Sequence, residues 1–289
     1  AGNTRTVDLG SINGGAALNS LTLNSSLDTV DTLDVGAING TGIETLTVVV
    51  DEANISMGGG AAFATAQELK TLSISNLDKD SSGDVTLGNI STADELTSIS
   101  ITTLGDTATG ETGGGTVVAV GDITATRAAT GDAITSYTVD LAGEYGASSV
   151  GAISGSADIG TISITTDTVG TSFGQGPITP TNGSITGDIT INTGTNFTGT
   201  SSATGFFQTE ANGSIGNIAI TAGGTTNISI TADHEFIGGA TTVGNIDLVT
   251  LAAADSINLG EIEQATTIGN ISVSGPGSVN MDGAPAATS

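Results

Sequence analysis

The residue types and spacing that best suit binding chemistry lie in the acidic segment DKDSSGD at residues 78–84. It matches the first half of a D-x-D-x-S-G calcium loop, in which alternate side-chain oxygens converge on a hard cation and glycine permits a sharp bend. The twelfth position of an EF-hand would be Asn89 rather than a bidentate Glu, so the segment is not a complete EF-hand. An ordinary acidic turn is the alternative interpretation. We predict that calcium is bound by Asp78, Asp80, Ser82 and Asp84.

The sequence shows no constellation of catalytic residues. Glycoside hydrolysis needs two carboxylates facing each other across a groove, usually beside aromatic platforms for the sugar, whereas Asp and Glu are spread singly here and Trp is absent. Polysaccharide lyase chemistry needs a Lys or Arg base near calcium, and only Lys79 lies in an acidic cluster. His234 is the only histidine and Cys is absent, which leaves no triad, zinc site or thiol nucleophile. We therefore predict a protein without enzymatic activity.

The charge of the chain is almost entirely of one sign. The 289 residues include 30 Asp and Glu against 4 Lys and Arg, which gives a formal net charge of −26. Nucleic-acid binding needs clustered cations and is not expected. The chain contains no run of about 18 apolar residues, so no membrane-spanning helix is predicted. Because the chain begins with Ala1 rather than Met, we expect a processed chain or a segment of a longer protein.

The elements that must position these residues form a repeat of the type apolar-x-x-apolar-x-apolar. Its last three positions alternate, as expected for a strand with one buried face. Most repeats follow one another at 25 to 29 residues, with one interval of 38. The middle apolar positions are Leu21, Leu46, Leu72, Ile99, Tyr137, Ile162, Ile189, Ile218, Ile246 and Ile271.

A second element, Gly-x-Ile, precedes many of the repeats and is often followed by a pair such as Asn13-Gly14 or Asn39-Gly40. Asn and Gly tolerate the left-handed backbone that a sharp corner requires. Two or three short strands with such corners in each repeat predict an all-β fold, a parallel β-helix or β-solenoid of about ten coils of 25–29 residues. The chirality of parallel crossovers favours a right-handed coil, although solenoids of both hands occur.

Two other architectures compete with this prediction. A leucine-rich repeat shares the period, but it needs Asn three positions after the last Leu, where this chain has Ser26, Asp51, Leu77, Leu104 and Ala142 in the first five copies. A β-sandwich array does not account for repeated identical columns. We therefore predict one solenoid domain over residues 1–289, with loop excursions near 105–116 and 194–213. A short helix is expected at 61–70, and the Phe residues of 194–213 are expected to form a satellite core or an exposed contact.

Phrases such as LNSLTLN, LKTLSISN and GNISVSG resemble the β-helical segments of bacterial surface-layer proteins and large secreted adhesins. The resemblance covers nearly the whole chain and lies in its general character, which is acidic, Lys-poor, Cys-free and rich in Thr, Ser, Ala and Gly. It implies an exported protein that assembles into lattices or fibres on the cell surface, frequently with calcium. The glycine-rich calcium nonapeptide of many such proteins is not found here, so only the 78–84 segment offers a local substitute.

From these observations we expect a structural, extracellular subunit of a surface layer, fibre or matrix. Solenoid ends expose unpaired strand edges that must be capped or joined, so we expect self-association through the ends, dependent on divalent cations. One alternative is an ice-binding or carbohydrate-binding solenoid that uses its Ser/Thr columns, with cell-surface polysaccharide as a partner. A polysaccharide-degrading β-helix enzyme is the other alternative.

Overall fold

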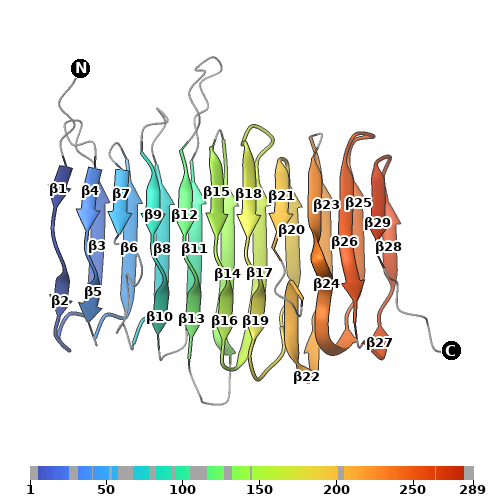
Figure 1. Ribbon diagram of the computed structural model, residues 1–289, viewed down its shortest axis with the longest axis horizontal. Helices are drawn as coiled ribbons and strands as arrows, with labels where there is room; N and C mark the ends of the chain where they lie inside the picture. The colour runs from blue at the N-terminus through green and yellow to red at the C-terminus, as the bar shows by residue number, and fades with distance from the viewer. Residues whose placement is uncertain are drawn as a thin grey trace.

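The computed structural model of this chain is an elongated β-solenoid (Figure 1). The described residues are 6–25, 32–40, 42–51, 54–57, 68–77, 83–92, 96–104, 116–126, 132–143, 145–200, 205–224, 226–263 and 265–282, with only the backbone described at 40, 132, 211 and 231–234. Within these ranges there is no helix, and therefore no helix that could cross a membrane. The predicted helix at 61–70 falls largely outside the described residues, as does most of the excursion at 105–116.

One face of the solenoid is a sheet of ten parallel strands, one for each predicted repeat. In β6, Leu46, Val48 and Val50 are buried while the residues between them are half-exposed, which confirms the predicted period of two. The strands in spatial order are β3 (Ser20–Ser25), β6 (Thr45–Val50), β8 (Thr71–Asn76), β11 (Ser98–Thr103), β14 (Asp132–Leu141), β17 (Asp158–Thr166), β20 (Ile189–Thr193), β23 (Ile218–Ala222), β25 (Ile246–Thr250) and β28 (Ile271–Ser274).

The opposite face is a seventeen-stranded sheet whose shorter strands lie in two rows (Figure 1). The first row contains β1 (Thr6–Asp8), β4 (Thr32–Val35), β7 (Asn54–Met57), β9 (Val85–Leu87), β12 (Val118–Val120), β15 (Ala147–Val150), β18 (Ser172–Gln175), β21 (Asn196–Gly199) and β29 (Ser278–Met281). The second row contains β10 (Ile90–Thr92), β13 (Ile123–Ala125), β16 (Ile153–Gly155), β19 (Ile178–Pro180), β22 (Phe207–Ile215) and β27 (Thr267–Ile268). The longer strands β24 (Asn227–Val243) and β26 (Ser256–Ile262) also belong to this sheet, and β2 (Ile12–Gly14) and β5 (Ile38–Gly40) form a separate pair.

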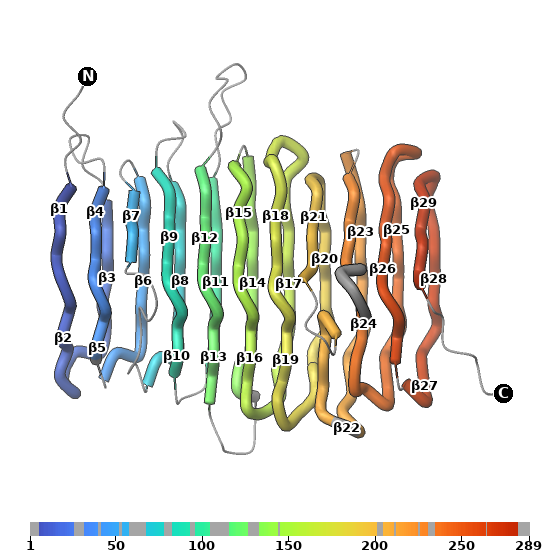
Figure 2. The backbone as a smooth tube through the Cα atoms, in the orientation of Figure 1, coloured from blue at the N-terminus to red at the C-terminus, as the bar shows by residue number. Residues whose placement is uncertain are grey.

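The chain passes alternately through the two faces, and each strand pairs in parallel with its counterpart one coil later (Figure 2). This topology confirms the predicted parallel β-solenoid. Counted as turns, the solenoid has about eight rather than the ten coils predicted. The first and last coils, with β1 and β29, lie at opposite ends of the rod.

A single apolar core fills the space between the two faces and is built from stacked Ile, Leu and Val. Residues 194–213, predicted as a loop excursion, instead carry β21 and part of β22, with 201–204 outside the described residues. Phe197, Phe206 and Phe207 are fully buried in this main core, so the prediction of a satellite core or an exposed contact was wrong. They form part of a chain of ring contacts, the aromatic column, that runs from Phe173 to Phe236 across neighbouring register positions with centroid separations of 4.7 to 6.3 Å. Phe173 and Phe197 are in register with Ile228, and Phe207 with Ile178 and Ile237, so at these positions aromatic side chains replace the usual Ile.

The repeat at Ile189 differs from the other copies in the spacing of its first two apolar residues. Ile185 bridges Ile159 in the preceding coil and Ile215 in the following one, so it occupies the first apolar position. One extra residue separates Ile185 from Ile189, compared with the other copies. The insertion lies at the corner before the strand, where it leaves the register of β20 with β17 unchanged.

Glycine at the bend between the two rows is required by close packing between coils. A Cβ on Gly176 would lie 2.5 Å from the Gly151 carbonyl carbon, which a real side chain cannot do. By contrast, Gly14 and Gly40 end strands and do not have the positive φ expected for Asn-Gly corners. The Gly-x-Ile element therefore marks a narrow bend between two strands of the same face.

Candidate functional site

Of the four predicted calcium ligands, the structure describes only Asp84; Asp78, Asp80 and Ser82 lie outside the described residues. Asp84 already holds neighbouring coils together. Its backbone N–H donates to Asn54 Oδ1 (2.7 Å), and its own Oδ1 accepts the N–H of Val117 (2.8 Å). Asp84 therefore has a structural role at the corner before β9, and calcium binding at this segment stays a prediction.

The contacts of Asp84 belong to a ladder in which a side-chain oxygen accepts a hydrogen bond from the next coil. The same arrangement occurs at Asn196, whose Oδ1 accepts the N–H of Asn227 (3.1 Å). In turn, Asn227 Oδ1 accepts the hydroxyl of Ser256 (2.8 Å). In each of these pairs the acceptor lies in the earlier coil and the donor in the later one. The ladder thus has a direction along the rod.

A second ladder of this kind lies at the corner before the ten-stranded sheet, in the sequence Gly-Asx-Ile. Asn217 Oδ1 accepts the N–H of Asn245 (3.0 Å), and Asn245 Oδ1 accepts the N–H of Asn270 (3.0 Å). A Cβ on Gly269 would lie 2.7 Å from Asn245 Oδ1, so the glycine leaves room for the amide of the preceding coil. The recurrence of Gly-Asn-Ile at 216–218, 244–246 and 269–271 is a sequence signal that could have identified this ladder.

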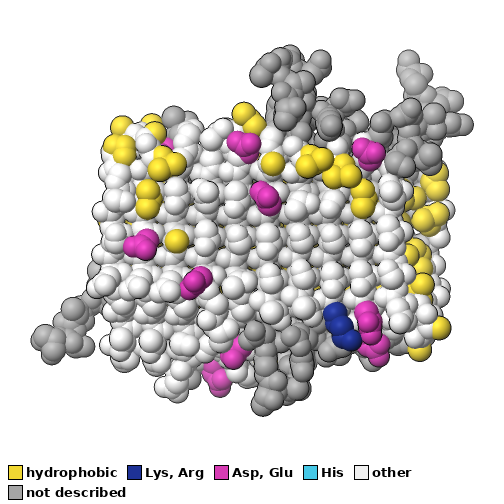
Figure 3. Space-filling model, turned by 180° about the vertical axis from the view of Figure 1, so that it is seen from behind, with side chains coloured by type: hydrophobic (Ala, Val, Ile, Leu, Met, Phe, Trp, Pro, Cys, Tyr) yellow, Lys and Arg dark blue, Asp and Glu magenta, His cyan; other side chains and the backbone are white. Residues whose placement is uncertain are grey.

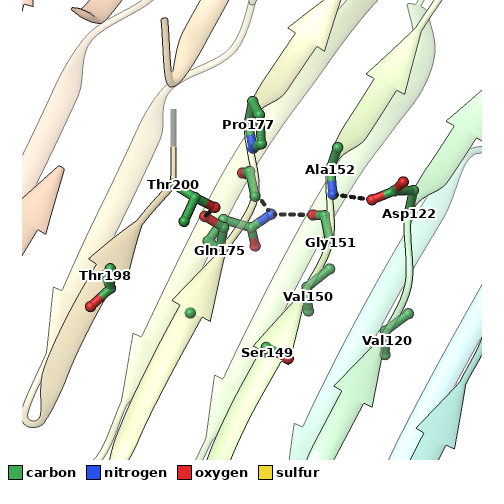
Figure 4. Close-up of a pocket in the computed structure, with 12 residues that line it drawn as sticks. Val120, Asp122, Ser149, Val150, Gly151, Ala152, Gln175, Pro177, Thr198 and Thr200 are labelled. Atoms are coloured by element: carbon green, nitrogen blue, oxygen red, sulfur yellow. Dashed lines mark hydrogen bonds between the residues drawn. The ribbon is translucent and has the colours of Figure 1, made fainter. Parts of the chain in front are cut away.

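A shallow groove of about 410 Å³ crosses the seventeen-stranded sheet at the glycine bend (Figure 4). Beneath it, buried Gln175 donates through Nε2 to the carbonyls of Gly151 (3.1 Å) and Gly176 (3.2 Å). The Tyr137 hydroxyl donates to Gln175 Oε1 (2.6 Å), and burial raises the pKa of Tyr137 well above its ordinary value. At the groove wall, Asp122 Oδ1 accepts the N–H of Ala152 (2.8 Å). These polar groups hold coils together, so the groove does not carry a recognisable catalytic arrangement.

An acidic row lies near the C-terminal end of the rod. Glu235 on β24 is in register with Glu261 on β26, with Glu263 close by. The pKa of Glu235 is raised from 4.5 to about 7, mainly by burial. A hydrogen bond with Glu263 and the charge repulsion of Glu263 and Glu261 add to this shift. Among the side chains that the structure describes, no group of three or more His, Cys, Asp and Glu could hold a metal ion. His234 lies in β24, but its side chain is not among those that the structure describes.

The outer surface of the ten-stranded sheet is broad and carries few charges (Figure 3). Lys70 is the one basic residue within the described ranges, and its Nζ contacts Glu44 Oε1 at 3.2 Å. The middle outward column is mostly hydroxyl-bearing, as predicted, with Asp247 as its charged member. In order along the rod the column contains Thr22, Thr47, Ser73, Ser100, Thr138, Ser163, Thr190, Ala219, Asp247 and Ser272.

Both ends of the rod expose residues that belong to the inward columns. At the C-terminal end, Ile271 and Val273 are 46% and 57% exposed, whereas their counterparts one coil earlier, Ile246 and Leu248, are fully buried. At the N-terminal end, Val7 and Leu9 are 39% and 48% exposed. Hydrophobic side chains are visible along the edge of the molecule at this end in Figure 3. The end coils therefore present apolar, strand-edged surfaces of the kind that the interior coils bury against each other.

No family model, curated protein or solved structure matches this chain. The ends, the ladders and the hydroxyl columns are thus the features from which a function must be argued.

Proposed function

We propose that this protein is a structural, extracellular subunit that builds rods, fibres or a surface layer by stacking its end coils on further coils. The observation that carries the proposal is the exposure of inward-column residues at both ends, above all Ile271 and Val273. Apolar area removed from water stabilises association by roughly 25 cal/mol per Å² before the costs of binding are subtracted. Among the described strands, β1 and β29 each pair on one side only, and their outer edges add hydrogen-bonding groups that another coil can satisfy.

The composition supports the same proposal. The scarcity of Lys and the absence of Cys fit the surface-layer and adhesin resemblance, which implies export. The net charge of −26 opposes close approach of copies at low ionic strength, and mobile cations screen it. We therefore expect assembly to increase with salt and with divalent cations.

The test is the size of the purified chain, measured by light scattering and negative-stain imaging over a range of protein and calcium concentrations. Ile271→Lys with Val273→Lys places two charges beside the joint at the C-terminal end and should weaken assembly. The matched control is Val169→Lys, which alters a side chain that is equally exposed (57%) but lies on a turn in the middle of the rod. A chain that stays monomeric under every condition would refute the proposal.

Calcium binding at Asp78, Asp80, Ser82 and Asp84 is proposed on the sequence pattern. A bound ion would stabilise the folded chain by mass action, so millimolar calcium should raise the melting temperature. Asp80→Asn should remove that rise without changing stability in the absence of calcium. A melting temperature that does not respond to calcium in the unaltered chain would remove the metal from the proposal.

A second candidate function is binding through the ten-stranded sheet, supported by the in-register Ser and Thr of its middle outward column. An ice surface demands a regular column of hydroxyl groups. This regularity is interrupted by Asp247 in the middle outward column, and by Asp140 and Val49 in the outward column beside it. Thermal hysteresis would support ice binding, and retention on insoluble polysaccharide would support carbohydrate binding. The absence of both would leave only the structural proposal.

A further inference from the structure

We propose that copies of this chain join head to tail, with β29 of one copy pairing in parallel with β1 of the next. This inference rests on the proposed function and specifies its interface: the partner is a second copy, and the contact is one particular strand pair. Three observations on the first row of strands carry it: the register of its columns, the charges at its two ends and the direction of its ladder.

The register follows from an unbroken series of parallel pairs along the first row. The long strands β24 and β26 join β21 to β29, so the same inward and outward columns continue from β1 on β4 through to β26 on β29. One more step in this register places Val279 of one copy against Val7 of the next, and Met281 against Leu9. Both apolar columns then run through the joint, and the exposed faces of Val7 and Leu9 are covered by side chains of similar size and shape.

The charges at the two ends favour this polarity over a head-to-head contact. Asp8 is the outward residue of β1 and lies in register with Asp34 on β4. A head-to-head joint brings these carboxylates of two copies together, and like charges on facing strands are destabilising. On β29 the outward residues are Ser278 and Asn280, which are uncharged. The head-to-tail joint therefore sets Asp8 against an amide.

The direction of the polar ladder argues against a tail-to-tail contact. In the first outward column, Asn196 and Asn227 each accept a hydrogen bond from a group one coil later. Ser278 occupies the last position of this column and Thr6 the first. In a head-to-tail joint the Ser278 hydroxyl faces the start of β1. Its oxygen, as the acceptor, then meets a backbone N–H of β1, as the donor. A tail-to-tail joint would instead oppose Ser278 with its own copy and reverse the strand direction.

The consequence of this polarity is open growth. A contact between two different surfaces of the same chain is heterologous, and each added copy presents a fresh end. Growth along the rod axis does not close, because β1 and β29 lie at opposite ends. The assembly expected is therefore a filament one solenoid wide.

The absence of cysteine from the chain allows a direct test by cross-linking. Thr6→Cys and Ser278→Cys, in one chain, place thiols on outward positions that face each other in the joint. Parallel neighbours lie about 4.8 Å apart, within the Cα separation of about 4.4–6.8 Å that a disulfide spans. The matched control combines Thr6→Cys with Ser272→Cys, which lies at the same end of the rod but on the ten-stranded sheet. Each variant is oxidised during assembly and separated without reductant.

The expected result is a ladder of covalent oligomers from the Thr6/Ser278 pair and none from the Thr6/Ser272 pair. Covalent dimers from Thr6→Cys alone or from Ser278→Cys alone, without longer species from the pair, would overturn the polarity. Filaments that form without any cross-link of the Thr6/Ser278 pair would overturn the register while leaving the proposed function intact. Monomers by light scattering, with no cross-link, would contradict both.

Discussion

Asp255 is a buried carboxylate, 1% exposed, that holds the turn between β25 and β26. Its Oδ2 accepts the N–H groups of Leu251 (3.0 Å) and Ala252 (2.6 Å) within its own turn. Its Oδ1 accepts the N–H of Thr226 in the preceding coil (2.9 Å). One side chain therefore closes a corner and joins two coils, which makes Asp255→Ala an informative perturbation.

The expected cost follows from where the three donors lie. Thr226 is buried, so losing the carboxylate leaves its N–H without a partner, at about 2 kcal/mol. The Leu251 N–H also donates to the Ala222 carbonyl (2.9 Å) and keeps that bond, so only the Ala252 N–H has to regain a partner from water, at about 0.5–1 kcal/mol. The sum is about 3 kcal/mol, or a factor of about 150 in the local opening equilibrium. Asp255→Asn keeps one acceptor oxygen and should lose roughly half as much.

Native-state hydrogen exchange measures this effect where it occurs. The stability of a repeat protein is a sum of local and nearest-neighbour contributions, so the loss should be confined to the coils around β23 to β29. Amides of β6 to β11 should exchange as before. Asp247→Asn is the matched control, because Asp247 lies on the neighbouring strand with its side chain exposed.

Two results would refute this reasoning. If Asp255→Ala accelerates exchange no more than Asp247→Asn does, the carboxylate does not hold the turn. If exchange accelerates equally in β6 and β26, the rod unfolds as one cooperative unit and the nearest-neighbour description is wrong.

Three further predictions concern the interior and the acidic row. The pKa of Glu235 is raised from 4.5 to about 7, so the folded state binds its proton more tightly than the unfolded state, and stability should fall as pH rises across that window. The urea midpoint of the Glu235→Gln variant should fall less steeply with pH than that of the unaltered chain. An unchanged dependence of the midpoint on pH would contradict the assignment to Glu235. Gly176→Ala should cost about 1–3 kcal/mol through overpacking, whereas Gly15→Ala, with nothing within 4 Å of the new Cβ, should change the urea midpoint little. Phe197→Ala should lose about 3–5 kcal/mol by thermal or urea unfolding because the ring is fully buried, and a loss below about 1 kcal/mol would mean that the aromatic column is not close-packed.

The fold was predictable because a single physical rule, alternation of apolar and polar residues, recurs at a regular interval. Strands such as β6 obey it over six residues, which is long enough to be recognised. Strands such as β10, Ile90–Thr92, have three residues and give no usable pattern alone. The column that contains Phe197 was missed because a change from aliphatic to aromatic residues coincided with a longer interval between repeats.

The side-chain ladders could not be derived in the same way. Asn54 and Asp84 are 30 residues apart, and their contact exists only because the coils stack in one particular register. Register depends on the lengths of all the intervening corners, which the sequence does not state directly. Asp255 was missed for a related reason, since a lone carboxylate in a turn looks the same whether it is solvated or buried.

The stacking of parallel strands along the rod also determines how the protein responds to force. The hydrogen bonds between coils run along the rod axis, so tension applied through the two ends opens them one coil at a time instead of shearing many together. A coil of about 25 residues occupies about 4.8 Å of the rod but spans about 85 Å when extended. Each coil that opens therefore lengthens the chain by about 80 Å at the expense of one layer of contacts. A filament of such rods would yield in small, repeated steps, and the coils left closed would stay folded.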